Sequence, residues 1–334
     1  MRRLAPAIGL FFLAPLVAEF LLGDFPITYL FALFLLAPMY GTGAILIREV
    51  VRRAGRGWPS MILLALAYGV FEEGITTQSL FDPNYADAHL LKHGFVPALG
   101  IAIPWTIYVL SLHAIWSIST PIAVVEAMST RGTTPWLNRR GMIIMSIVFV
   151  IGSGATLAAS YSSDHYIASP TQLTVVVLVV AALILTALRL PLAKTDPVTS
   201  TLVTSTATAP NAWLVLVAAL IAGAVLQIGS DVLPTWLAVV AVLAAELAIV
   251  VAVRAWSARS GWGANHRLAL AAGALLTYAW HAFGQSPVVA ASGTMSVISH
   301  IVFAIAALVL LAIATRRVRR PVTAEVTEPE PSLV

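Results

Sequence analysis

The feature of this sequence that most constrains its fold is a series of ten apolar segments, each about as long as a membrane is thick. A bilayer core of about 30 Å is crossed by an α-helix of roughly 20 apolar residues. Backbone groups in lipid must find partners within the chain, so such segments fold as helices. We therefore predict an all-α polytopic transmembrane helix bundle with about ten spans, near residues 5–22, 27–50, 60–80, 97–127, 141–161, 171–190, 211–230, 232–254, 267–284 and 293–315.

Composition agrees with a membrane protein surrounded by a lipid bilayer. Hydrophobic residues make up 59% of the chain and charged residues only 10%, whereas a soluble domain is roughly a quarter charged. The net charge of +4 does not indicate a nucleic-acid partner, because the basic residues are dispersed over short loops. Cysteine is absent, which excludes disulfides, thiolate nucleophiles and cysteine metal sites.

The distribution of charge predicts the orientation in the membrane. If the chain crosses at every span, nearly all lysines and arginines fall on one side. The loops on the other side carry several aspartates, with Lys92 as the only lysine or arginine. The positive-inside rule then places both termini in the cytoplasm of a multi-pass protein of the cell membrane.

Two polar stretches divide the chain. Residues 191–210 are rich in threonine, serine and proline, which is typical of a linker. We expect this cytoplasmic linker to join a six-span helical bundle (1–190) to a four-span bundle (211–315). Residues 316–334 are polar and rich in proline, so we expect a disordered cytoplasmic tail.

The stretch "AYGVFEEGITTQ" (67–78) sets Glu72 and Glu73 within an apolar span. A charged group at the centre of a membrane helix costs roughly 2.5–3.5 kcal/mol, so such residues usually face the bundle interior and mark function. His113 lies at a similar depth in the next span, which runs back across the membrane. Because sequential helices commonly pack together, we expect His113 to come within reach of at least one glutamate.

Adjacent helical residues point about 100° apart. We therefore expect only one of Glu72 and Glu73 to face a polar cavity, and the other to accept a hydrogen bond from a neighbouring helix. Three further polar residues, Glu19, His281 and His300, lie toward the outer ends of spans one, nine and ten. These residues either line an outward-facing vestibule with the site or form structural hydrogen bonds, and the structural role is favoured for the histidines and most of all for Glu19.

Other intramembrane residues suggest packing rather than chemistry. Arg48 and Glu49 end the second span, and we interpret them as an interfacial anchor in which the arginine snorkels to the surface. Gly41 and Gly43 in "YGTGAILIRE" predict close helix packing. Glu246 has no obvious partner in the sequence.

The glutamate pair followed by a histidine resembles the CPBP family of intramembrane proteases, whose motifs run EExxxR, FxxxH and HxxxN or HxxxD. "EEGITT" supplies both glutamates but has Thr77 where the family has arginine. "VLSLH" supplies His113 with Val109 in place of phenylalanine. "HAFGQ" supplies His281 with Gln285, much later in the chain than the family spacing.

This resemblance implies a water molecule, activated by glutamate and histidine, that attacks a peptide bond of a membrane-embedded substrate. In that case Glu72 or Glu73 is the general base, and His113, with His281 or His300, polarises the carbonyl or binds a metal such as zinc. Metal dependence stays open, because no closely spaced ligand pair such as HExxH occurs. Two other classes remain: a proton-coupled transporter or permease with a midplane protonation site, and a non-catalytic membrane scaffold.

Overall fold

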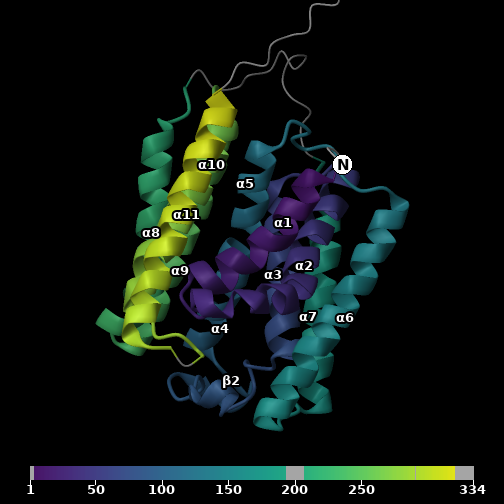
Figure 1. Ribbon diagram of the computed structural model, residues 1–334, viewed down its shortest axis with the longest axis vertical. Coiled ribbons are helices and arrows are strands. Elements are labelled where there is room, and N and C mark those ends of the chain that lie inside the picture. Colours follow the sequence, from purple (N-terminus) through teal and green to yellow (C-terminus); the bar gives the residue numbers. More distant parts are fainter. Residues whose placement is uncertain (1–3, 193–206, 290, 320–334) are drawn as a thin grey trace, which may run out of the picture.

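The computed structural model describes residues 4–192, 207–289 and 291–319, and nearly all of the expected spans lie on long helices (Figure 1). The α-helices are α1 (Ala5–Pro15), α2 (Leu33–Arg53), α3 (Trp58–Phe71), α4 (Ile103–Leu112), α5 (Thr120–Met128), α6 (Arg139–Asp164), α7 (Pro170–Arg189), α8 (Ala212–Val232), α9 (Thr235–Ser257), α10 (Ala264–His281) and α11 (Gly293–Arg319).

Short segments of other helical geometry extend or connect these helices. Three are π-helical and continue an α-helix: η1 (Leu16–Leu21) after α1, η3 (Glu72–Thr76) after α3, and η5 (His113–Ser119) between α4 and α5. The 3-10 segments are η2 (Ile27–Ala32), which leads into α2, η4 (Tyr85–Asp87) and η6 (Ala282–Gly284). Strands β1 (Phe95–Val96) and β2 (Ile101–Ala102) pair antiparallel in a small hairpin.

The predicted fold class, an all-α membrane helix bundle, is confirmed. Within the described residues, seven helices are long and apolar enough to cross a membrane. They are Ile27–Arg53, Ile103–Met128, Arg139–Asp164, Pro170–Arg189, Ala212–Gly229, Thr235–Ser257 and Gly293–Arg319. The first expected span corresponds to the shorter apolar helix Ala5–Leu21. The expected spans 60–80 and 267–284 lie on α3–η3 and α10, so the count of ten remains a prediction.

Two boundaries differ from the expected spans near the glutamates. The third span ends at Thr76 rather than at residue 80, because Gln78 adopts a φ of 60° that ends the helix. The fourth begins at Ile103 rather than at residue 97, since the preceding residues form the β1–β2 hairpin. The chain between these helices lies at the end of the bundle opposite the N-terminus (Figure 1), and we call this end the loop face.

The helices differ in how far the rest of the bundle covers them. Only 11% of the apolar stretch is buried in each of α6, α7 and α9, which leaves their surfaces available to lipid. The stretches in Ile27–Arg53 and Ile103–Met128 are 56% and 61% buried, so these helices form the interior. In Figure 1 α8, α10 and α11 stand along one side and α6 and α7 along the other.

The expected six-span and four-span bundles share an apolar cluster within the described residues. This cluster joins Val17 and Trp116 to α8, α10 and α11. The Trp116 ring stacks on Tyr278 with 4.7 Å between ring centroids, and its Nε1 donates to the Ala274 carbonyl at 2.8 Å. The division into two bundles remains a prediction. The expected linker falls largely on 193–206 and the expected tail on 320–334, both outside the described residues, although α11 runs on to Arg319.

The interpretation of Arg48 as a snorkelling anchor is wrong, because Arg48 and Glu49 are fully buried. Arg48 donates to Glu49 at 2.6 Å and to Glu126 at 3.0 Å, and it also donates to the carbonyls of Gly132 and Thr134. The guanidinium carbon lies 3.5 Å from the centroid of the Trp136 ring. These contacts fasten the loop after α5 to α2, so the arginine joins elements inside the bundle instead of reaching the surface.

The two glycines of α2 allow close packing, as expected. A methyl group on Gly41 would collide with the backbone of Phe11 in α1, and one on Gly43 would collide with the ring of Tyr68 in α3. Glu246, for which the sequence offered no partner, accepts the hydroxyl of Ser111 in α4 at 2.5 Å. Gly41 and Gly43 therefore allow α1 and the Tyr68 ring to pack close to the axis of α2.

The orientation in the membrane is a prediction that reporter fusions can test. With the positive-inside arrangement, reporters inserted in 191–210 and fused after residue 334 should both report the cytoplasm. A reporter inserted at 84–92, in the loop face, should report the exterior. Opposite signals from the linker and the C-terminus would overturn the ten-span topology, because an odd number of spans would then separate them.

Candidate functional site

The three π-helical segments carry four ionisable residues of the bundle centre, three of them buried and Glu19 half-buried. Glu19 lies in η1, Glu72 and Glu73 open η3, and His113 opens η5. A π-helical turn is rare and often occurs at functional sites. That three of them meet around four ionisable side chains makes this the strongest candidate site among the described residues.

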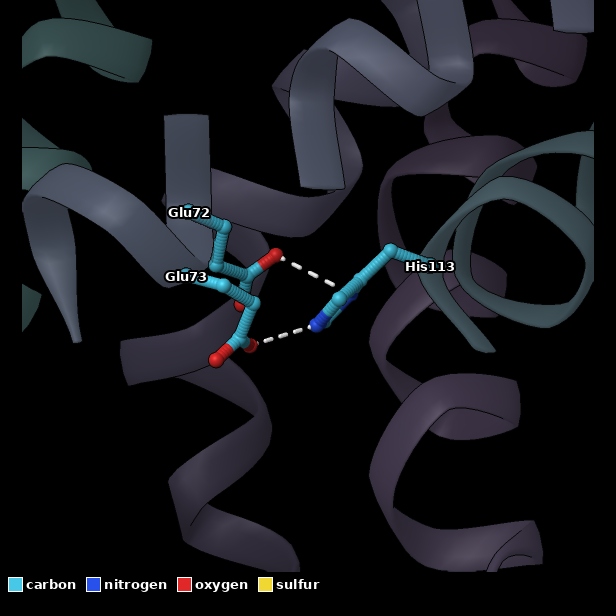
Figure 2. Close-up of side chains that lie close together, drawn as sticks. All are labelled: Glu72, Glu73 and His113. Carbon is cyan, nitrogen blue, oxygen red and sulfur yellow. Dashed lines mark hydrogen bonds and ion pairs between the residues drawn. The ribbon is translucent and has the colours of Figure 1, made fainter. Parts of the chain in front are cut away.

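The side chains of Glu72, Glu73 and His113 face one another (Figure 2). His113 Nε2 lies 2.6 Å from Glu73 Oε1, and Nδ1 lies 3.1 Å from Glu72 Oε2. Nδ1 is also 3.1 Å from the Ser117 hydroxyl, one turn further along η5. All three ionisable residues are buried, with exposed fractions of 1%, 5% and 6%. The predicted approach of His113 to the glutamates is confirmed.

The expectation that Glu72 and Glu73 point in different directions is wrong, whereas the expectation that only one of them faces a polar cavity remains a prediction. Both carboxylates reach His113, one at each ring nitrogen (Figure 2). The expectation assumed α-helical geometry, but the two residues lie in a π-helical turn. Such a turn holds more residues, so adjacent side chains diverge by a smaller angle. The imidazole ring, which offers nitrogens on two sides, fits between the carboxylates.

Glu73 is the better anchored of the two glutamates. Its Oε2 accepts hydrogen bonds from the hydroxyls of Thr77, at 3.1 Å, and Ser79. The Ser79 hydroxyl in turn accepts from Trp105 Nε1 at 3.1 Å. Thr77, which stands where the CPBP motif has arginine, therefore contacts the second glutamate of the pair. Through Ser79 and Trp105 the carboxylate is tied to the start of the loop face and to α4.

Glu72 is bonded differently. Its backbone carbonyl accepts the hydroxyls of Thr76 and Thr77. Its side-chain Oε2, although near His113, has no hydrogen-bond partner of normal geometry. One oxygen of Glu72 thus has no hydrogen bond of normal geometry, whereas both oxygens of Glu73 take part in one.

Three residues at the site were not assigned to it from the sequence. Tyr40 donates its hydroxyl to Glu19 Oε1 at 2.5 Å and stacks on the ring of His113, with 6.0 Å between centroids. Tyr68 meets the same imidazole edge-on, at 6.1 Å. Glu19 interacts electrostatically with His113 and Glu73. A carboxylate inside the first apolar span was the only available signal for Glu19, and its nearness to the expected membrane surface favoured a structural role.

His281 and His300 do not join this cluster. His281 accepts a hydrogen bond from the Gln285 side chain, and His300 packs edge-on against Phe283 and lies beside Gly23. Within the described residues, the only group of three or more potential metal ligands is Glu72, Glu73 and His113. Of the five residues proposed for the site from the sequence, the structure brings Glu72, Glu73 and His113 together.

The same three residues are the best candidates for metal ligands. One ligand atom of each lies within 4.8 Å of the others. Two carboxylates and one imidazole are donor types that zinc accepts. Zinc binding remains a prediction, and elemental analysis of the purified protein is the direct measurement.

Comparison with known proteins identifies the family of the chain and assigns no activity to it. No curated protein and no solved structure gives a significant match to the chain. The family model that matches is described as an uncharacterized membrane protein family and not as the CPBP proteases, so that resemblance is confined to the two partial motifs. The match extends over residues 10–328, and the chain therefore belongs to this uncharacterized membrane protein family.

Proposed function

We propose that the protein is an intramembrane hydrolase that activates water for attack on a peptide bond of a membrane-embedded substrate. The observation that carries the proposal is the clamp of His113 between Glu72 and Glu73, at 3.1 and 2.6 Å, in the interior of a membrane bundle. Two carboxylates in different hydrogen-bonding environments and one imidazole supply a base, a proton donor and a positioning group.

In this proposal Glu72 is the general base. Its Oε2 has no hydrogen-bond partner of normal geometry, so it is free to accept a proton from a water molecule. The water oxygen bonds to the carbonyl carbon while its proton passes to the carboxylate. The tetrahedral intermediate then collapses, the C–N bond breaks, and the leaving nitrogen takes up that proton.

Glu73 and His113 have supporting roles. Glu73 is held by Thr77 and Ser79 and lies against His113 Nε2, so it fixes the orientation of the imidazole ring. The Nδ1 side of the ring faces Glu72 and Ser117. A ring fixed in this way can hold the Glu72 carboxylate in position to take the proton of the water molecule.

The choice of a peptide bond rests on the CPBP resemblance. The positions of this chain that match the first two motifs, Glu72 and His113, lie in contact, which supports the comparison. The third motif has no counterpart at the site, since His281 pairs with Gln285 elsewhere. Glu19 and Tyr40 occupy the neighbourhood of His113 instead, and they are candidates for a family-specific substrate contact.

A proton-coupled permease is the second candidate, and one observation favours it. Because both nitrogens of His113 face carboxylates, the imidazole can take a proton at one nitrogen and release one at the other. One observation argues against a permease. Glu72, Glu73 and His113 all come from the first 113 residues of the chain and not from two halves of the bundle. Transporter sites commonly lie between such halves.

Membrane proteomics of cells with the wild-type protein and with Glu72→Gln/Glu73→Gln tests the proposal. We expect peptide fragments that appear with the wild-type chain and are lost with the double variant. Glu246→Gln is the matched control, because it also removes a membrane carboxylate that accepts a serine hydroxyl. Identical fragments from all three strains would refute hydrolysis. A loss of pH-dependent solute uptake without lost fragments would support the permease, and no change in either would support a scaffold.

A further inference from the structure

Tyr68 presents a hydroxyl without a hydrogen bond of normal geometry at the candidate site. The residue lies on α3 one turn before Glu72, and only 5% of it is exposed. Its hydroxyl has no hydrogen-bond partner of normal geometry. Leaving a buried hydroxyl unpaired costs about 1–3 kcal/mol, so a side chain that only packed in this position would be better as phenylalanine.

The position of the hydroxyl is fixed by the packing of the ring. One edge of the ring lies against Gly43, where a methyl group would not fit. The ring also contacts Tyr40, Phe149 and His113, at centroid distances of 6.1, 6.2 and 6.1 Å. These contacts hold Tyr68 beside the imidazole and leave its hydroxyl little freedom to seek another partner.

Two unpaired polar atoms therefore face the same site. One is the donor hydroxyl of Tyr68, and the other is the acceptor Oε2 of Glu72. The hydroxyl of Tyr68 interacts with the carboxylate of Glu72, although not with the geometry of a normal hydrogen bond, which places the hydroxyl beside the carboxylate. A donor and an acceptor side by side in a buried site can bind a ligand that offers an acceptor and a donor in turn. A substrate carbonyl group with a water molecule beside it offers both.

We propose that Tyr68 is a catalytic residue that donates its hydroxyl hydrogen bond to the substrate carbonyl oxygen while Glu72 takes the proton of the attacking water. This assignment rests on the hydrolase proposed above. As the water oxygen adds to the carbonyl carbon, the carbonyl oxygen gains negative charge, and the phenol stabilises it without transferring its own proton. A donor aimed at this developing charge contributes about 10²–10³-fold to the rate.

The test compares Tyr68→Phe with Tyr108→Phe in the purified full-length protein, using a quenched-fluorescent synthetic copy of a peptide released in wild-type membranes. Tyr108 is the matched control, because its hydroxyl donates to Gln227 at 2.9 Å outside the site. We expect kcat of Tyr68→Phe to fall about 10²–10³-fold with KM nearly unchanged, since the bond forms in the transition state. Tyr108→Phe should keep the wild-type kcat.

Thermal unfolding in detergent supplies an independent reading. Tyr68→Phe should melt at or above the wild-type temperature, because it removes an unpaired buried hydroxyl, whereas Tyr108→Phe should melt lower. A Tyr68→Phe protein that is less stable than Tyr108→Phe would show that the hydroxyl serves the fold, and would overturn the assignment. Equal cleavage by the wild-type and Tyr68→Phe proteins would also overturn it but leave the hydrolase proposal standing. No cleavage by the wild-type protein would overturn both.

Discussion

Replacing Glu72 by glutamine should abolish hydrolysis and leave the protein folded. Glutamine keeps the shape of the side chain but cannot take the proton of water, and general base catalysis contributes about 10²–10⁴-fold to the rate. The Glu72 carboxylate lies 3.1 Å from His113 Nδ1 and has one oxygen without a hydrogen-bond partner of normal geometry. The amide of glutamine has the same shape and can keep a polar contact with the imidazole. We expect a loss of that size in kcat on the peptide identified by proteomics, with a melting temperature close to that of the wild type.

The neighbouring substitution, Glu73→Gln, should show the opposite balance. Glu73 Oε2 accepts hydrogen bonds from Thr77 and Ser79, and Oε1 faces His113 Nε2. An amide replaces one of these acceptors by a donor, so at least one contact is lost. Hydrogen bonds to charged groups contribute about 1.5–3 kcal/mol, and we expect a destabilisation of that order with a smaller fall in kcat than for Glu72→Gln.

Comparing the activities of Glu72→Gln and Glu73→Gln decides which carboxylate is the general base. Full activity in both single variants and in the double variant would exclude titratable chemistry at residues 72 and 73. A larger loss of activity in Glu73→Gln than in Glu72→Gln would exchange the roles assigned to the two carboxylates. Glu246→Gln controls for the general effect of removing a carboxylate from a membrane helix, because its partner Ser111 lies outside the cluster around His113.

The contact between Glu72 and His113 could be predicted from the sequence, because the two residues lie on helices that follow each other in the chain. Glu72 and His113 lie at similar depths in consecutive antiparallel helices, and such helices commonly pack together. Their contact at 3.1 Å follows from that connectivity. The fold class was equally accessible, since lipid leaves a chain of apolar segments few alternatives to helices.

The parts that the sequence did not reveal depend on packing between distant elements. The π-helical turn that directs both Glu72 and Glu73 to one histidine has no sequence signature of its own, so regular α-helical geometry gave the wrong orientation. Glu19 joins the site because α1 packs along α2, where Gly41 permits close contact. His281 was assigned by motif resemblance and by its place among the polar residues at the outer ends of the spans, and its side chain is paired with Gln285 instead.

Replacing Arg48 by methionine should destabilise the bundle more than any other substitution considered. Methionine is close to arginine in length but removes the charge, which leaves Glu49 and Glu126 with one fewer cationic partner each. It also frees the carbonyls of Gly132 and Thr134. Removing one partner of a buried ion pair costs about 3–5 kcal/mol, and we expect a loss of this size in denaturant unfolding of the protein in mixed micelles.

Matched variants separate the buried charge from the arginine side chain as such. Arg139 is exposed at the start of α6, so Arg139→Met should unfold like the wild type. If the loss in Arg48→Met comes from the unpaired Glu49, then Arg48→Met/Glu49→Met should recover part of it, because exchanging a whole buried pair for apolar groups is often neutral. Recovery will be incomplete, since Glu49 also accepts the backbone amides of Trp136 and Leu137. A single variant as stable as the wild type would mean that this buried network orients the loop after α5 without holding the bundle together.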